Sequence, residues 1–308
     1  MELPPNFPNV EHSEGNEFRM ERWSLGKKLF FDTILSKDGS TSCASCHNPE
    51  LAFSDNDKFS LGFDGAIGTR NSSPLFNVAY HPYFTREGGV PTLEFQVLVP
   101  IQEHNEFNNN IVLIADTLSK IPAYFEMSMA AYDQPPTPYV ITRSLAQFER
   151  SLISGQSLFD LEINYQIKNS MTEAALRGMD LFNGSVANCS TCHGGFNFTN
   201  YTFQNNGLYE EYLDEGRERL TGEESDVALF KVPSLRNIEL TAPYMHDGSM
   251  DDLETVIEHY ISGGKNHINK SKIIRPFQLN QTEKQDLLAF LKSLTDENFI
   301  SNKQFQND

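Results

Sequence analysis

The chain has 308 residues, enough for two domains of ordinary size, each with its own hydrophobic core. Its 24 basic and 42 acidic residues give a net charge of −18, which disfavours nucleic acid and anionic membranes as partners. No apolar run reaches the length of a membrane span, so we expect no transmembrane segment.

Helical periodicity recurs along the chain between long segments rich in Gly, Pro, Asn and aromatic residues. The predicted helices are residues 18–31, 110–132 with an interruption at Pro122, 139–152, 172–182, 251–261 and a last helix that begins at a capping box, Thr282–Gln285, and continues to Leu291. No segment shows a strand pattern. The chain is therefore predicted to be all-α and loop-rich.

Two five-residue motifs stand out, one in each half of the chain. Both have the sequence C-x-x-C-H, and they comprise Cys43, Cys46 and His47, then Cys189, Cys192 and His193. This is the attachment signature of c-type haem, in which two thiols bond to the porphyrin and the histidine ligates the iron. Two C-x-x-C pairs can also form a four-cysteine zinc site, but zinc leaves the histidines unexplained. We therefore expect two covalently bound c-type haems.

The two halves share further matches in the same order. A Gly-x-x-Leu-Phe segment precedes each haem motif, beginning at Gly26 and at Gly178. The later matches are Leu75–Val78 with Leu235–Ile238, Pro82–Phe84 with Pro243–Met245, and Gly88–Glu94 with Gly248–Glu254. We predict two cytochrome-c-like domains, residues 17–160 and 161–308, related by internal duplication.

The two copies differ at the position seven residues after the matched Leu93 and Leu253. Tyr260 in the second half can bind ferric iron, whereas Pro100 in the first has no ligating group. If the same helix covers both irons, the N-terminal haem keeps an open position and the C-terminal haem is closed. The alternatives are a core tyrosine, or ligation by His259, Met250 or Met245.

An open haem that cleaves peroxide needs a group to take and return a proton. Glu106 follows Pro100 by six residues, and Gln96 precedes it by about one helical turn. Without the haem motif, these two residues would be interpreted as a surface glutamate and a hydrogen-bonded glutamine. His104 is interpreted as a surface residue.

These motifs resemble the bacterial dihaem cytochrome c peroxidase family, and in particular its MauG-like branch. The resemblance covers nearly the whole chain, and its most specific pieces are both C-x-x-C-H motifs and the segments Gly68–Asn71, Leu93–Pro100 and Ala242–Gly248. It implies two cytochrome-c-like domains and one Ca²⁺ ion, held by Asn71 and the carbonyls of Thr241 and Pro243.

The resemblance also assigns roles to individual residues. Glu106 matches the family's distal acid–base glutamate, Gln96 its partner glutamine, and Tyr260 the distal ligand of the second haem in MauG. Phe63 stands where many members have a removable histidine, which implies an enzyme that needs no reductive activation. Arg86 replaces a tryptophan that lies between the haems in relatives.

The expected function is reduction of hydrogen peroxide at the N-terminal haem, with the C-terminal haem relaying electrons. The alternatives are MauG-like oxidation of a protein substrate and a non-catalytic dihaem electron carrier. Expected partners are hydrogen peroxide and a small redox protein (a cytochrome c or a cupredoxin) or a protein substrate. The expected compartment is the periplasm, where bacterial c-type haem is attached, with the export signal removed and a lipid anchor left open.

Overall fold

The computed structural model describes residues 3–307, which form two compact units. We call them the N-terminal unit (Asn9–Phe84, Val90–Ile153 and Ile300–Asp308) and the C-terminal unit (Met1–Pro8, Thr85–Gly89 and Ser154–Phe299). Each unit contains one C-x-x-C-H motif. The domain boundary expected at residue 160 stays a prediction.

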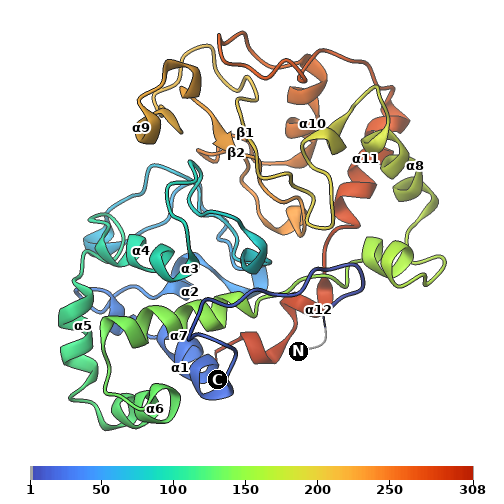
Figure 1. The fold of residues 1–308 in the computed structure, drawn as a ribbon. Helices are drawn as coiled ribbons and strands as arrows, with labels where there is room; N and C mark the ends of the chain where they lie inside the picture. Colours follow the sequence, from blue (N-terminus) through green and yellow to red (C-terminus); the bar gives the residue numbers. More distant parts are fainter. Residues whose placement is uncertain (1–2, 308) are drawn as a thin grey trace. The chain divides into compact units, whose positions relative to one another are not determined.

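Short helices separated by long loops make up both units (Figure 1). The N-terminal unit contains α1 (Met20–Phe31), α2 (Cys43–Cys46), α3 (Leu93–Gln96), α4 (Leu98–Gln102), α5 (Ile111–Leu118), α6 (Pro122–Tyr132) and α7 (Pro138–Arg150). The C-terminal unit contains α8 (Glu173–Asn183), β1 (Phe203–Gln204), α9 (Glu218–Thr221), β2 (Phe230–Lys231), α10 (Leu253–Ser262) and α11 (Gln281–Lys292). A last short helix, α12, spans Glu297–Ile300.

The predicted helices are present, with three local differences. The segment 110–132 forms two helices because Pro122 opens α6. The capping box of α11 consists of Asn280 and Glu283, so the helix begins before Thr282. β1 and β2 form a minimal antiparallel ribbon, in which Phe203 lies opposite Lys231, where no strand was expected. No helix within residues 3–307 is long and apolar enough to cross a membrane.

A glycine allows the two main helices of the N-terminal unit to cross closely. α1 packs against α7, and a Cβ atom at Gly26 would lie 1.9 Å from the Ser144 carbonyl oxygen. Phe30 and Phe148 pack beside this crossing, with ring centroids 5.0 Å apart. Trp23 lies at the same interface, packs against Phe148 and donates its indole N–H to Ser151 at 2.8 Å.

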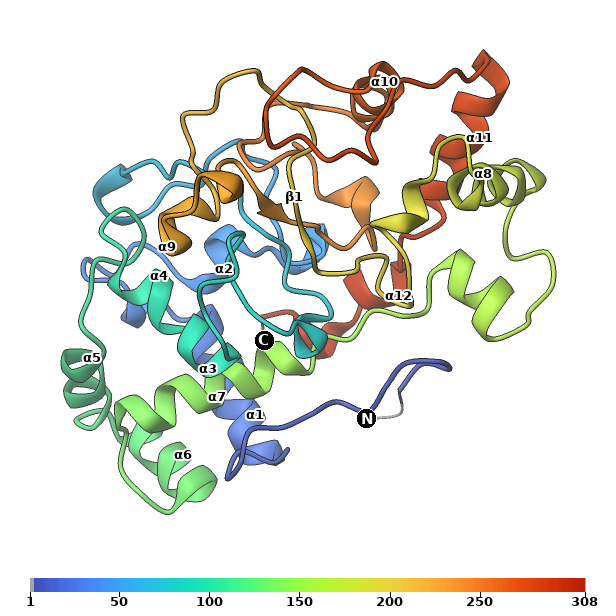
Figure 2. The same ribbon diagram turned by 45° about the horizontal axis from the view of Figure 1, so that its top comes forward.

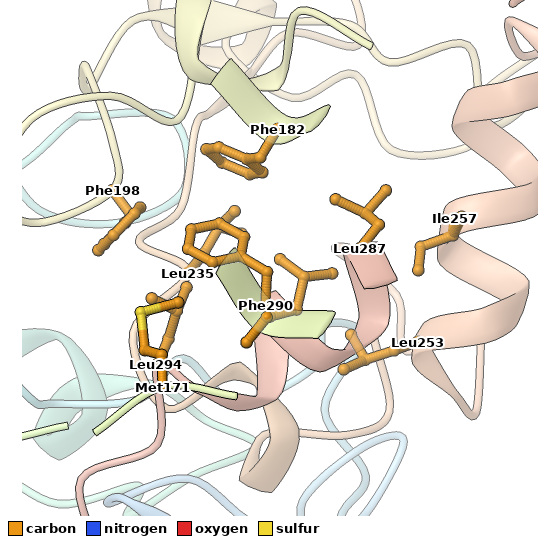
Figure 3. Close-up of a cluster of buried hydrophobic side chains, with 11 residues drawn as sticks. Met171, Phe182, Phe198, Leu235, Leu253, Ile257, Leu287, Phe290 and Leu294 are labelled. Atoms are coloured by element: carbon orange, nitrogen blue, oxygen red, sulfur yellow. The ribbon is translucent and has the colours of Figure 1, made fainter. Parts of the chain in front are cut away.

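The C-terminal unit repeats this arrangement with α8 and α11, which lie side by side in Figures 1 and 2. A Cβ atom at Gly178 would lie 1.9 Å from the Asp286 carbonyl oxygen. Phe182 and Phe290 pack next to the crossing with ring centroids 5.0 Å apart, inside the apolar cluster of Figure 3. Both crossings therefore require a residue without a side chain.

Further backbone features recur at a constant spacing of 160 residues. Asn77 and Asn237 both adopt left-handed conformations, with φ of 56° and 53°. Phe84 pairs with Val90 as Tyr244 pairs with Met250. By this pairing, Phe84 in the first half corresponds to Tyr244 in the second half. The sequence match of Phe84 with Met245 was therefore wrong by one residue.

Candidate functional site

The first C-x-x-C-H motif lies on a single helical turn. α2 begins after Ser42, whose side chain forms a capping box with Ser45. Cys43 and Cys46 occupy the two ends of this turn, and the His47 amide donates to the Cys43 carbonyl at 3.0 Å. A helical turn brings residues three apart to the same face, so both thiols can reach one edge of a porphyrin.

His47 is held in the form that a haem iron requires. Its Nδ1 lies 3.0 Å from the Phe53 carbonyl oxygen. Because a carbonyl only accepts hydrogen bonds, Nδ1 carries the proton and Nε2 keeps its lone pair. Burial lowers the pKa of His47 to about 4, so the ring is neutral at physiological pH.

The second motif has the same chemistry on a 3₁₀ turn, Cys189–Thr191. The His193 amide donates to the Cys189 carbonyl at 2.9 Å. His193 Nδ1 lies 3.3 Å from the Phe198 carbonyl and 3.2 Å from the Pro233 carbonyl, and burial lowers its pKa to about 4. Nε2 of His193 is therefore also the nitrogen available for iron.

Two phenylalanines that were not identified from the sequence orient these histidines through their backbone carbonyl groups. Phe53 and Phe198 supply the carbonyl acceptors from left-handed conformations, with φ of 61° and 49°. Such values are strained for bulky residues and persist only where packing imposes them. Phe53 packs against Phe148 (6.3 Å) as Phe198 packs against Phe290 (6.2 Å). The helix crossing thus orients the loop that holds each ligand.

The cysteines lack the environment of reactive or zinc-binding thiolates. Burial raises the pKa of Cys46 and of Cys189 to about 11, and it raises the pKa of Cys43 well above its ordinary value. Reactive thiols have a lowered pKa instead. Within residues 3–307, no three His, Cys, Asp or Glu side chains gather into a metal site, so the zinc alternative has no support.

The N-terminal unit brings Phe63, Pro100 and Glu106 together. The Phe63 amide donates to the Glu106 carbonyl at 2.7 Å, and the Phe107 amide donates to the Pro100 carbonyl at 3.1 Å. The Glu106 charge raises the pKa of both Cys43 and Cys46, which places its carboxyl group near the two thiols.

Glu106 has the protonation properties of an acid–base group. Glu106 is exposed as a whole residue, but protein surrounds its carboxyl group. The resulting desolvation, with a smaller contribution from the charge of Glu103, raises the pKa of Glu106 to about 7. A carboxyl group with this pKa can both accept and return a proton near neutral pH. His104, by contrast, is exposed and contacts Asn108 at 3.0 Å, which confirms it as a surface residue.

Gln96, the last residue of α3, has an unsatisfied polar atom. Its Oε1 is buried, and no residue of the described chain donates a hydrogen bond to it. A buried acceptor left in this state is costly unless a bound group satisfies it. The atom therefore fits a site that receives a ligand with an O–H group.

Glu149 was missed in the sequence because it follows the helical pattern of α7 like any other residue. It is 7 % exposed, and burial raises its pKa to about 8. Its charge also raises the pKa of Cys43, so this carboxyl group lies near the first haem motif.

Tyr260 lies on α10, near the second pair of cysteines. Burial raises its pKa to about 12, and the charges of Cys189 and Cys192 contribute to this shift. A hydrogen bond from the Asn206 side chain opposes it. Of the rival ligands, His259 contacts the Asn206 carbonyl through Nε2 at 3.1 Å.

Met245 Sδ accepts a hydrogen bond from Asn206 at 3.2 Å, and Met250 pairs with Tyr244 through its backbone. Met245 and Met250, the other candidate ligands of the second iron, thus each have a defined contact within the C-terminal unit.

The residues expected to bind calcium belong to separate units. Asn71 is in the N-terminal unit and donates through Nδ2 to the Asp57 carbonyl at 3.2 Å. Thr241 and Pro243 are in the C-terminal unit. Arg86 also belongs to the C-terminal unit, where its carbonyl accepts from the Lys231 amide at 2.7 Å.

Comparison with known proteins identifies the family. Residues 20–167 match the model of the di-haem cytochrome c peroxidase family. The chain is 36 % identical over 291 residues to methylamine utilization protein MauG of Methylorubrum extorquens, covering 93 % of this chain and 81 % of that protein. It is 34 % identical to cytochrome c551 peroxidase of Nitrosomonas europaea, covering 88 % of this chain and 79 % of that protein.

A solved structure agrees with this assignment. The crystal structure of a MauG-like protein associated with microbial copper homeostasis superimposes with a TM-score of 0.94 at 33 % identity, covering 99 % of this chain and 97 % of that one. With two haem motifs of matching local geometry, the chain belongs to the bacterial dihaem cytochrome c peroxidase family, in its MauG-like branch.

Proposed function

We propose that this protein is a peroxidase-like oxidoreductase that reduces hydrogen peroxide at an open N-terminal haem, while a six-coordinate His/Tyr C-terminal haem relays electrons. The observation that carries the proposal is the difference between equivalent positions: Pro100 has no ligating atom, and Tyr260 has one beside the second pair of cysteines. Membership of the family supports peroxidase-like or MauG-like chemistry.

Two covalent haems fit the residues present. Cys43 and Cys46 would hold one and Cys189 and Cys192 the other, with His47 and His193 ligating through Nε2. Bound haem would supply an iron that takes up peroxide and exchanges electrons. Calcium binding by Asn71, Thr241 and Pro243 remains a proposal based on resemblance.

The chain's own residues manage the protons. Glu106, with a pKa of about 7, accepts the proton of hydrogen peroxide and returns it to the leaving oxygen. Gln96 Oε1 accepts a hydrogen bond from the peroxide O–H and so orients it. Phe63 lies beside Glu106 and cannot ligate iron, so no side chain has to leave before peroxide binds.

The two units are also proposed to derive from an internal duplication. The matched glycine crossings at Gly26 and Gly178, and the matched acceptors Phe53 and Phe198, support this origin. A periplasmic location is also proposed, because bacterial c-type haem is attached in that compartment.

Oxidation of a protein substrate is the second candidate function. It is favoured by the 36 % identity with MauG over most of the chain and by a tyrosine at position 260. The electron donor then becomes a side chain of another protein in place of a small cytochrome c or cupredoxin. Mass spectrometry of candidate proteins after exposure to the enzyme and peroxide distinguishes the two functions.

The proposal predicts the spectrum of the oxidised protein. Electron paramagnetic resonance should detect one high-spin and one low-spin ferric haem, and stopped-flow absorbance should show reaction with peroxide without prior reduction. Tyr260→Phe should convert the low-spin signal to high-spin and leave the original high-spin signal unchanged. Two low-spin haems in the unaltered protein would overturn the proposal.

A non-catalytic electron carrier remains the alternative of a different class. Glu106→Gln separates the two, because a carrier would not respond to this change whereas a peroxidase should lose much of its rate with peroxide.

A further inference from the structure

Five ring-bearing side chains of the C-terminal unit form a connected cluster. Tyr209 and Tyr212 follow β1, and their ring centroids lie 5.4 Å apart. Tyr212 lies 5.9 Å from His246, whose ring stacks on Phe230 of β2 at 4.2 Å. His267 completes the cluster at 5.2 Å from Tyr212. The rings therefore follow one another closely, and Tyr212 connects most of them.

Tyr209 is an exposed member of this cluster and has a base at its hydroxyl group. The residue is 36 % exposed, and its hydroxyl donates to Asp247 Oδ2 at 2.6 Å. This distance is typical of a hydrogen bond from a hydroxyl group to an ionised carboxylate. The Ser249 amide donates to the other oxygen of Asp247, Oδ1, at 3.2 Å. Asp247 thus accepts through both oxygens, as a carboxylate does.

The hydroxyl group of Tyr212 has partners of a different kind. It accepts from the Leu208 amide at 2.8 Å and donates to Asn205 Oδ1 at 3.2 Å. A carboxylate can be protonated, whereas a carboxamide oxygen only accepts hydrogen bonds. Because an oxidised phenol is a strong acid, a tyrosine holds an oxidising equivalent where a base takes its proton. Tyr209 meets this condition, and Tyr212 is suited only to pass an electron on.

Hydrogen bonds connect Tyr212 to α10, the helix that carries Tyr260. Asn205, which accepts from Tyr212, is followed by Asn206, whose carbonyl oxygen lies 3.1 Å from His259 Nε2. The His259 ring centroid lies 5.4 Å from that of Tyr260 on the same helix. One path of ring contacts, hydrogen bonds and covalent bonds therefore runs from the cluster to the proposed ligand of the second iron.

The surroundings of Tyr209 indicate which donor fits there. Segment 209–215 contains no basic residue, and its acidic residues are Glu210, Glu211, Asp214 and Glu215. Leu213 in the same segment is fully exposed. A protein with basic residues around its redox group is attracted to such a segment and brings that group close to Tyr209.

We propose that Tyr209 and Asp247 form a redox site through which a basic protein donor passes single electrons toward the second haem. Tyr209 gives up one electron through Tyr212, and its hydroxyl proton moves to Asp247. The donor then returns one electron to Tyr209, and the proton comes back from Asp247. Two such cycles, with two protons from solvent, supply the reduction of one hydrogen peroxide to water. The inference therefore rests on the proposed function, which supplies the oxidant.

Freeze-quench electron paramagnetic resonance of the holoprotein mixed with peroxide tests the inference. The unaltered protein should form a tyrosyl radical, whose signal narrows when the protein is labelled with ring-deuterated tyrosine. Tyr209→Phe should abolish this radical, and Asp247→Asn should strongly reduce it because the proton acceptor is gone. Both variants should keep the low-spin spectrum of the second haem, which reports that its unit is folded.

Tyr139→Phe is the matched control. Tyr139 is 41 % exposed and packs edge-on against Tyr132 at 6.1 Å, much as Tyr209 packs against Tyr212. The Arg143 guanidinium group lies 3.7 Å from the centre of its ring, and a nearby positive charge opposes the loss of an electron. The Tyr139→Phe variant should therefore retain the radical.

Electron transfer from a reduced basic cytochrome c gives a second measurement. Tyr209→Phe should lose most of this rate, and Tyr139→Phe should keep it. If the unaltered protein does not react with peroxide, the proposed function and this inference both fall. If it reacts, but no radical depends on Tyr209 or the cytochrome reduces Tyr209→Phe equally fast, only this inference falls.

Discussion

The acid–base role proposed for Glu106 predicts how the reaction with peroxide depends on pH. Because the deprotonated carboxylate is the base, its catalytic contribution should be absent well below its pKa of about 7 and complete above it. The rate constant for reaction with peroxide should therefore rise about tenfold per pH unit below this value and then level off.

Glu106→Gln should lower that rate by about 10²–10⁴-fold and abolish the pH step, as measured by stopped-flow absorbance. Glu103→Gln is the informative companion, because the Glu103 charge contributes to the raised pKa of Glu106. It should move the step to lower pH and retain the plateau rate. A pH step that survives in Glu106→Gln would assign the proton transfer to another group.

The C-terminal unit contains an ion pair that is fully buried. Arg236 and Asp160 are both 0 % exposed and form two hydrogen bonds, of 2.7 and 2.9 Å. Arg236 also donates to the Phe196 carbonyl at 2.8 Å, close to the segment that holds His193.

Arg236→Met should destabilise the protein by about 3–5 kcal/mol, since it leaves a buried carboxylate without its partner. Chemical denaturation of the holoprotein measures this change. The control is Lys292→Met, which breaks an ion pair with Glu239 whose two side chains are 48 % and 37 % exposed, and it should cost about 1 kcal/mol or less. Equal losses in the two variants would show that burial does not determine the cost.

At the scale of elements, both units depend on a helix crossing that only glycine allows. Gly26→Ala and Gly178→Ala would each place a methyl group 1.9 Å from a backbone carbonyl oxygen, so the helices must separate. Each substitution should lower the free energy of unfolding by about 2–3 kcal/mol, as observed for overpacked cores. Gly68→Ala, whose Cβ would meet nothing closer than 3.8 Å, is the matched control and should have little effect.

The positions of the long helices could be predicted from the sequence, whereas the backbone contacts to the haem-motif histidines could not. Periodicity located the long helices, and the Gly-x-x-Leu-Phe segments that begin at Gly26 and Gly178 indicated that the halves are alike. The carbonyl acceptors Phe53 and Phe198 were not predictable, because any residue has a carbonyl and only the folded backbone directs it toward a histidine.

The whole molecule carries a net charge of −18, and this should govern which electron donor it meets rapidly. Long-range attraction raises the association rate of a partner of opposite charge and is screened over about 10 Å at 0.1 M salt. The second-order rate constant with a basic cytochrome c should therefore fall steeply as salt increases, whereas that with an acidic donor should rise. An uncharged small reductant should react at a rate independent of salt and serves as the control. If the rate with the basic donor does not change with salt, the acidity of this chain serves solubility and the donor binds through contacts other than charge.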